Sequence, residues 1–228
     1  MHEMSSLNPW FSLIDEDERA KICDNVSFIK IKKGHVLFRR GELVDNVAMI
    51  RSGILWCERT SPEGRNHVQA VMGPGFFGHF AWPLVKSLAN YDVKAVIDAE
   101  VFVIPGAIIR YLMDNSKSFA ARYTGLMIRS HEMLEEYTFV MSVYDKVQKV
   151  AWILSIIADG YRGLSRPIMN IPITQVQLAD NMGMTRQTIN KSLQSLSDTG
   201  IINVSKSNIN ILDLGRLKNI CHFDDHVY

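Results

Sequence analysis

Long hydrophobic runs are absent from this sequence of 228 residues, and none approaches the roughly 20 apolar residues that a membrane-spanning helix needs. The first residues, MHEMSSLNPWF, lack the basic and apolar regions of a signal peptide. Cysteine is scarce, and Cys23, Cys57 and Cys221 lie too far apart to indicate a disulfide framework. These absences predict a cytoplasmic protein in a reducing compartment, without a membrane partner.

Catalytic motifs and a strong overall charge are also missing. The chain has no Gly-rich phosphate loop, no nucleophile elbow and no paired metal-ligand motif, so we do not expect an enzyme. A formal net charge of +1 gives no global indication of nucleic-acid binding. Phosphate attraction is local, however, because it acts within about 8–10 Å. Residues 162–206 carry five cations against two anions, which makes this segment the candidate.

Hydrophobic periodicity divides the chain into parts. Residues 9–27 show helical spacing, whereas residues 27–105 contain short apolar or alternating runs that end at Gly, Pro, Asn or Asp. Regularly spaced short strands of this kind predict a small barrel or jelly roll. We therefore expect an α+β protein whose residues 1–115 form a β-roll preceded by a helix.

A long helix is predicted after the strands. Its apolar positions recur at steps of 4 and 3 over more than three heptads, with one polar interruption. These positions are Phe119, Tyr123, Leu126, Ser130, Met133, Tyr137, Val140 and Tyr144, and Met127, Leu134 and Met141 lie beside them. The seam predicts a dimerisation helix over residues 116–144 and hence a homodimer. The alternative is a helix that packs on its own β-domain, and one helix can do both.

The remaining residues, 145–228, predict a separate small domain. Asp145 is a candidate N-cap for a further helix. The stretch ITQVQLADNMGMTRQTINKSLQSLSDTGII then predicts two helices joined at Gly183, which suits a left-handed turn. The runs Ile201–Val204 and Ile209–Leu212 predict a hairpin. Two helices followed by a hairpin make a winged helix-turn-helix.

The second helix of this motif has a polar outer face. Ile189, Leu193 and Leu196 would point inward, which leaves only hydrogen-bond donors and no acid on the outside of the first two turns. Arg pairs with guanine, Gln or Asn with adenine, and Lys with guanine or phosphate. The predicted DNA-binding residues are Thr174 and Thr185 at the helix starts, Arg186, Gln187, Asn190 and Lys191 on the helix, and Lys206 at the wing tip.

Taken in order, these features resemble the Crp/Fnr (catabolite activator and fumarate-nitrate regulator) family of bacterial transcription factors. The resemblance covers nearly the whole chain and includes KKGHVLFRRGE, MIRSGILW, GPGFFGHF and the recognition-helix pattern TRQTINKSL. It implies a cyclic-nucleotide-binding-like β-roll and a homodimeric regulator that binds a palindromic operator. Arg186 and Lys191 stand where many members place cations, whereas Gln187 departs from the Glu common there, so a different base preference is expected.

The resemblance does not extend to the residues that hold cyclic AMP. His79 stands where the ribose-binding Glu is expected, and Ala89 and Asn90 fall near the Arg-Ser pair that binds the cyclic phosphate. Without that Arg a buried phosphate would lack a full counter-charge. Three distant cysteines cannot hold an iron–sulfur cluster in one subunit. His67 or His79 as a haem ligand, and the tail residues Cys221, His222, Asp224, Asp225 and His226 as metal ligands, are weaker alternatives than structural roles.

The cofactor is therefore unknown, and an apolar or aromatic effector, or none, is expected. The predicted pocket lies between the β-roll and the long helix, lined by His79, Phe80, Trp82, Tyr91, Met127 and Leu134. For Phe80, Met127 and Leu134, core packing is the simpler interpretation. By the resemblance, the basic loop Arg162–Arg166 is a candidate contact for RNA polymerase. The competing hypothesis is a haem- or ligand-binding sensory module that acts through protein contacts.

Overall fold

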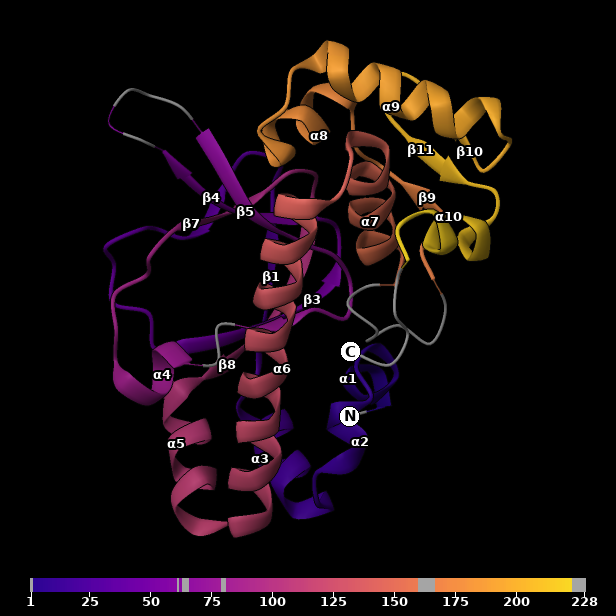
Figure 1. Cartoon of the computed structure of the whole chain (residues 1–228). Helices are drawn as coiled ribbons and strands as arrows, with labels where there is room; N and C mark the ends of the chain where they lie inside the picture. The colour runs from indigo at the N-terminus through magenta and orange to yellow at the C-terminus, as the bar shows by residue number, and fades with distance from the viewer. Residues whose placement is uncertain (1, 61, 63–65, 79–80, 160–166, 223–228) are drawn as a thin grey trace.

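The computed structural model describes residues 2–60, 62, 66–78, 81–159 and 167–222. A β-roll is followed by one long helix, and a small helical domain with its own short sheet lies at the far end of that helix (Figure 1). The mixed α+β architecture predicted from the sequence is confirmed. Within the described residues, no helix is both long and apolar enough to cross a membrane.

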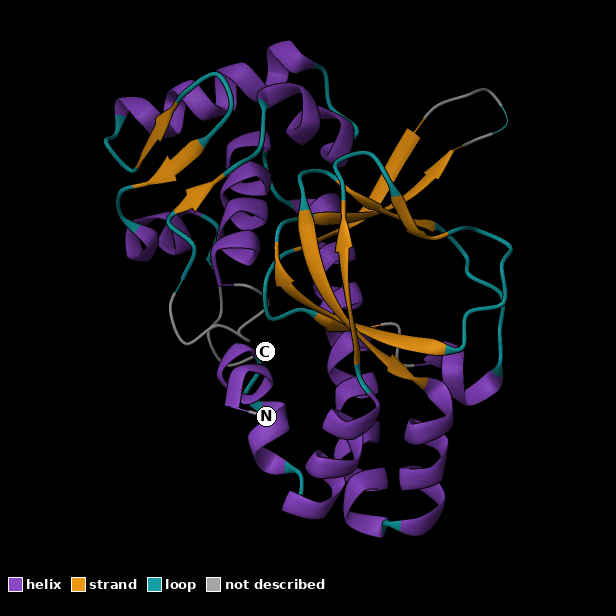
Figure 2. Ribbon diagram, turned by 180° about the vertical axis from the view of Figure 1, so that it is seen from behind, coloured by secondary structure: helices purple, strands orange, loops and turns teal. Residues whose placement is uncertain are grey.

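Three short helices precede the roll: α1 (His2–Leu7), α2 (Trp10–Leu13) and α3 (Glu16–Asn25). The roll consists of two four-stranded antiparallel sheets with the strand orders β1-β8-β3-β6 and β2-β7-β4-β5 (Figure 2). The strands are β1 (Ser27–Ile31), β2 (Val36–Phe38), β3 (Asn46–Ser52), β4 (Leu55–Thr60), β5 (Asn66–Met72), β6 (Phe77–Gly78), β7 (Asp92–Ala95) and β8 (Ala99–Pro105). Their buried side chains fill the interior with apolar groups.

The turn between β3 and β4 requires glycine. Gly53 has a φ of +91°, and a Cβ atom there would lie 2.5 Å from the carbonyl oxygen of Asp98. An L-residue would therefore be strained by its backbone and would also collide with the β7–β8 turn. This close approach is what lets the β3–β4 turn pack against Asp98 and Ala99.

Helices α4 (Ala81–Val85), α5 (Gly106–Asn115) and α6 (Lys117–Val143) cover one end of the roll and lead out of it. Ser116 begins α6 by accepting a hydrogen bond from the backbone N–H of Phe119 at 3.1 Å. The same serine donates to Glu18, the buried carboxylate of the α3 capping box. The starts of α3 and α6 are thus fixed to each other by side-chain hydrogen bonds.

The predicted apolar seam of α6 packs mainly within its own chain. Phe119 and Tyr123 are fully buried and join an aromatic cluster with Trp10. Val140 is fully buried at the other end, and the ring of Tyr137 lies 5.9 Å from that of Trp152. Spacing of 4 and 3 does not distinguish a partner copy from the rest of the same chain, and Phe119, Tyr123 and Val140 are buried within the chain. The large apolar side chains of α6 that remain exposed are Ile128, Leu134, Phe139 and Val143.

The small domain at the end of α6 has the winged helix-turn-helix arrangement. It comprises α7 (Lys146–Asp159), β9 (Asn170–Ile171), α8 (Gln175–Met182), α9 (Arg186–Asp198), β10 (Ile202–Val204), β11 (Ile209–Ile211) and α10 (Leu214–Ile220), with the sheet order β10-β11-β9. Asp145 caps α7, as predicted, because its Oδ1 accepts from the N–H groups of Val147 and Gln148. The hairpin matches its prediction to within one residue at each outer end, whereas β9 and α10 were not predicted.

One sheet of the roll packs directly against this small domain. Leu55 and Cys57 of β4 point into the roll, whereas Trp56, between them, belongs to the hydrophobic cluster of α7, α8 and α9. Val71 of β5 and Val96 lie in that same cluster, and α8 lies against β5 (Figure 1). Strand β4 is therefore shared between the interior of the roll and the core of the small domain.

Candidate DNA-binding site

The first helix of the motif, α8, begins at a complete capping box. The Thr174 side chain accepts from the backbone N–H of Gln177 at 3.2 Å, and the Gln177 side chain accepts from the backbone N–H of Thr174 at 2.9 Å. Two N–H groups that would otherwise lack partners are thereby satisfied. Thr174 is a helix cap, so its predicted contact with DNA would be additional to a structural role.

The turn between α8 and α9 has the predicted left-handed glycine. Gly183 has φ +59° and ψ 29°, and its N–H donates to the carbonyl oxygen of Ala179. Thr185 then caps α9 by accepting from the N–H of Thr188 at 3.1 Å. A Cβ atom at residue 183 would meet nothing within 4 Å, so its backbone angle, rather than crowding, favours glycine there.

Helix α9 separates its apolar and polar sides as the sequence predicts. Ile189, Leu193 and Leu196 are at most 1% exposed, which fixes the inner side of the helix in the domain core. Arg186, Gln187, Asn190 and Lys191 are all exposed on the opposite side. In the described part of the chain, the side chains of Arg186, Gln187 and Lys191 have no hydrogen-bond or ion-pair partner. They are free to bind another molecule.

The outer side of α9 lies on the surface of the molecule farthest from the start of α6 (Figure 1). The hairpin β10–β11 lies beside α9, and its turn is closed by a 2.9 Å hydrogen bond from the N–H of Ser205 to the carbonyl oxygen of Asn208. Lys206 is exposed in that turn. The N-terminus of α9 and the cation of Lys206 suit DNA phosphates, and the hydrogen-bond donors on the outer side of α9 suit base edges.

Two protein-family models match this chain. The cyclic nucleotide-binding domain matches residues 28–116, and the Crp-like helix-turn-helix domain matches residues 148–220. Together they cover both the β-roll and the motif just described. The chain belongs to the Crp/Fnr family of transcription regulators. It is a DNA-binding regulator of the Crp/Fnr type.

Individual relatives of this Crp/Fnr regulator are distant. The transcriptional activator protein FnrL of Cereibacter sphaeroides is 22% identical over 210 residues, which are 89% of this chain and 84% of FnrL. The CRP-like cAMP-activated global transcriptional regulator of Mycobacterium tuberculosis is 24% identical over 219 residues, 91% of this chain and 93% of that protein. The solved structure of FixK2 from Bradyrhizobium japonicum has a TM-score of 0.71 at 16% identity, covering 86% of this chain and 96% of FixK2.

The predicted effector residues of this Crp/Fnr regulator that the structure describes lie in separate parts of the fold. His79 and Phe80 lie outside the described residues, and of Trp82 only the backbone, in α4, is described. Tyr91 packs in the interior of the roll, Met127 packs against the amino-terminal aromatic cluster, and Leu134 is 46% exposed. Tyr91, Met127 and Leu134 thus lie in three different environments, and a shared effector pocket stays a prediction.

The roll interior contains a sulfur-rich site that was not predicted. The buried Cys57 thiol lies 3.6 Å from the Met72 sulfur and also forms a hydrogen bond with Tyr91. Burial raises the pKa of the Cys57 thiol and of the Tyr91 hydroxyl well above their ordinary values. Both groups are therefore neutral at physiological pH. The alternation of β4 was the only sequence signal that could have placed Cys57 inside.

The position expected to hold the phosphate-binding Arg is part of the core. Ala89 is 3% exposed and packs with Val93 and Ala95, whereas Asn90 is exposed. Lys94, a conceivable substitute, instead forms an ion pair with Glu58 at 3.0 Å. Among the described residues of the roll, no free cation lies in the apolar core that surrounds Ala89.

The tail considered as a metal site lies partly outside the described residues, including Asp224, Asp225 and His226. Cys221 is buried against α10, and the His222 ring lies 6.5 Å from that of Tyr144. No group of three metal-ligating side chains occurs among the residues the structure describes.

Proposed function

We propose that this Crp/Fnr regulator binds a palindromic operator as a homodimer and reads base edges with α9. The observation that carries this proposal is the outer side of α9, where Arg186, Gln187 and Lys191 are exposed and have no partner among the described residues, whereas the inner side is buried. Arg186, at the start of the helix, suits a bidentate contact with guanine. Lys191 suits guanine or phosphate, Gln187 suits adenine, and Lys206 in the wing suits phosphate.

The homodimer is supported by apolar side chains that α6 leaves in contact with solvent. Ile128, Phe139 and Val143 are each at least 50% exposed, and their spacing of 11 and 4 places them on one side of the helix. Burying one such side chain contributes roughly 1.5–3 kcal/mol. If the α6 helices of two copies pack in parallel, the two α9 helices can enter successive major grooves of DNA, which are ~34 Å apart.

A small effector other than ordinary cyclic AMP is the proposed signal. A cyclic phosphate would need a full counter-charge, and the Arg position is occupied by the buried Ala89. An apolar or aromatic ligand does not have that requirement. The candidate contacts for this effector are His79, Phe80, Trp82, Tyr91, Met127 and Leu134. The effector would act on the α6–α7 hinge at Tyr144–Lys146, shifting the population of correctly spaced α9 helices.

Two further parts of the proposal concern the cell. Contact with RNA polymerase through Arg162–Arg166 is retained from the resemblance, although this loop lies outside the described residues. A regulator that acts on chromosomal DNA works in the cytoplasm, which is the localisation we propose.

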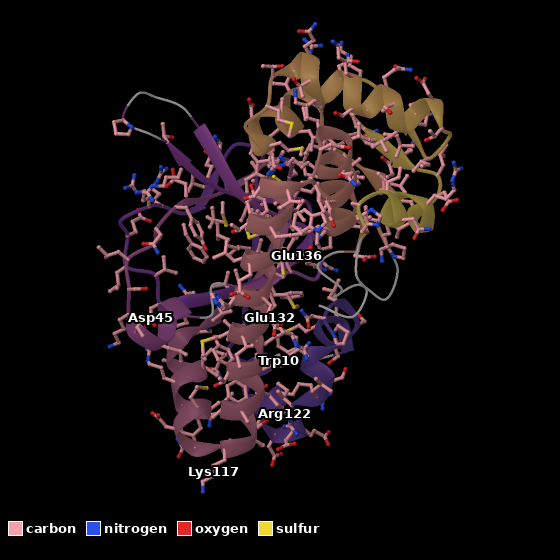
Figure 3. The ribbon with its side chains drawn as sticks, viewed as in Figure 1. Trp10, Asp45, Lys117, Arg122, Glu132 and Glu136 are labelled. Atoms are coloured by element: carbon pink, nitrogen blue, oxygen red, sulfur yellow. The ribbon has the colours of Figure 1, made fainter. Side chains whose placement is uncertain are left out.

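The test begins by selecting operators from random duplexes with the full-length protein. Arg186→Ala is then expected to reduce affinity for the selected operator by roughly fivefold to 150-fold, because a bidentate contact with guanine contributes about 1–3 kcal/mol. Lys117→Ala removes a cation from the opposite end of the molecule and serves as the matched control (Figure 3). Unchanged binding by Arg186→Ala would contradict the assignment of α9 as the reading helix.

A further inference from the structure

A pair of carboxamides links the two helices of the helix-turn-helix at its outer surface. The Nδ2 group of Asn190, on the second turn of α9, donates to Oε1 of Gln175 at 3.4 Å. Gln175 is the first residue of α8, half-buried, whereas Asn190 is exposed. Gln175 was not among the predicted DNA-binding residues. No motif indicates it, because its role depends on the packing of α8 against α9.

Both partners are held on well-defined backbone. Gln175 lies between Thr174 and Gln177, whose reciprocal hydrogen bonds fix the first turn of α8. Asn190 follows Ile189, which is fully buried, and Thr185 caps the start of its helix. The geometry of the pair is therefore set by two capped helices and not by flexible loops.

The hydrogen bond limits what Asn190 can offer to DNA. A free Asn carboxamide has two N–H donors and one carbonyl acceptor, and it can direct both donors to N7 and O6 of guanine. When one N–H is bound to Gln175, one donor and the carbonyl remain. Adenine requires that set, since its N7 accepts a hydrogen bond and its N6 amino group donates one.

We propose that Gln175 is a positioning residue that makes Asn190 select adenine over guanine in the operator. This inference rests on the proposed reading role of α9 and assigns a specificity-determining partner to it. Gln175 acts through Asn190, without itself having to reach a base. The pair occurs once in each subunit, so the preference appears at the equivalent position in both half-sites.

The test uses the full-length protein and duplexes selected by it, with A·T replaced by G·C at each half-site position in turn. The wild type is expected to prefer adenine at one position by roughly tenfold to a hundredfold, and Asn190→Ala should remove this preference. Gln175→Met keeps the side-chain length but has no acceptor, and it should reduce the preference at that same position only. Unfolding should be unchanged, because the bond is exposed.

Two further variants separate positioning from other effects. Gln175→Glu retains an acceptor for Asn190, so it should keep the adenine preference while weakening binding to every duplex through phosphate repulsion. Gln194→Met removes a carboxamide that bonds to Asp198 at the far end of α9, and it should leave the preference intact.

The outcomes distinguish the two proposals. If Gln175→Met keeps the full preference, or if Gln175→Glu loses it, Gln175 does not position Asn190 as stated and the inference is overturned. The same holds if Asn190→Ala changes no base preference, and in either case sensitivity to Arg186→Ala would still support α9 as the reading helix. If the wild type selects no sequence, the proposed function itself fails.

Discussion

Two residues inside the roll, Cys57 and Tyr91, make the stability of the folded protein decrease at alkaline pH. Burial raises the pKa of Cys57 and Tyr91 in the folded protein. The unfolded chain loses these protons above about pH 8.5 for the thiol and about pH 10 for the phenol. The folded state keeps them, so the associated stability is fully present below about pH 8.5 and declines as the pH rises further.

The prediction is a free energy of unfolding that falls by up to about 1.4 kcal/mol per pH unit for each group above its unfolded pKa. Cys57→Ala should make the decline between pH 8.5 and 10 shallower, because one titrating group has been removed. Urea unfolding at several pH values measures the slope. Met72→Leu changes the same site without removing an ionisable group, and a slope altered equally by both variants would contradict the assignment.

Secondary-structure elements show which sequence patterns are informative. The caps Thr174, Thr185 and Asp145 were predicted correctly because a cap depends only on neighbouring residues. The length of α6 was also predictable, because the apolar periodicity that marks a helix is a local property of the sequence. Whether an α6 position packs inside the chain or against a second copy was not predictable, since buried residues such as Phe119 and Tyr123 and an intermolecular seam have the same spacing.

The exposed side of α6 provides a prediction at the scale of the element. Phe139→Glu should shift the protein from dimer to monomer, because it places a charge where an apolar side chain would be buried. Sedimentation at several concentrations measures the change. Leu13→Glu, at a comparably exposed apolar position on α2, should leave the oligomeric state unchanged. A dimer that persists in Phe139→Glu would require another interface.

The acidic residues on this side make the proposed dimer sensitive to charge. Glu132 and Glu135 lie between Ile128 and Phe139 at helical spacing, and Figure 3 shows Glu132 near the middle of α6. Parallel helices would bring these carboxylates of two copies near the two-fold axis, where like charges repel. The dimer forms only if the free energy gained by burying the apolar side chains is larger than this electrostatic repulsion.

At the scale of the whole molecule, the contact between the roll and the DNA-binding domain is the feature that sequence could not supply. Tyr91 packs in the interior of the roll and Met127 packs with the amino-terminal aromatic cluster, and neither environment is readable from the sequence because each depends on how distant segments fold together. In the sequence, Trp56 is one residue of an apolar run. Its contact with the core of the DNA-binding domain appears only in the folded structure, where α7 and α8 pack against it.

Trp56→Ala should therefore weaken the contact between the two domains. Loss of a buried Trp costs about 3–5 kcal/mol, and here the cost falls on a cluster shared by β4 and α7. Two separate unfolding transitions are expected in calorimetry in place of one, with the small domain unfolding first. Trp56→Phe should retain the single transition. An unchanged transition in Trp56→Ala would mean that the domains do not stabilise each other.

The two-faced strand β4 has a consequence for exchanging sensors between regulators of this family. Leu55 and Cys57 face the interior of the roll, whereas Trp56 and the preceding Ile54 pack in the core of the DNA-binding domain. The inner set can be redesigned for another ligand while the outer set is left untouched. A one-residue slip of β4 against β5 and β7 would instead exchange the two sets and turn Trp56 into the roll. A functional chimera joined in the β3–β4 turn must therefore preserve the register of β4.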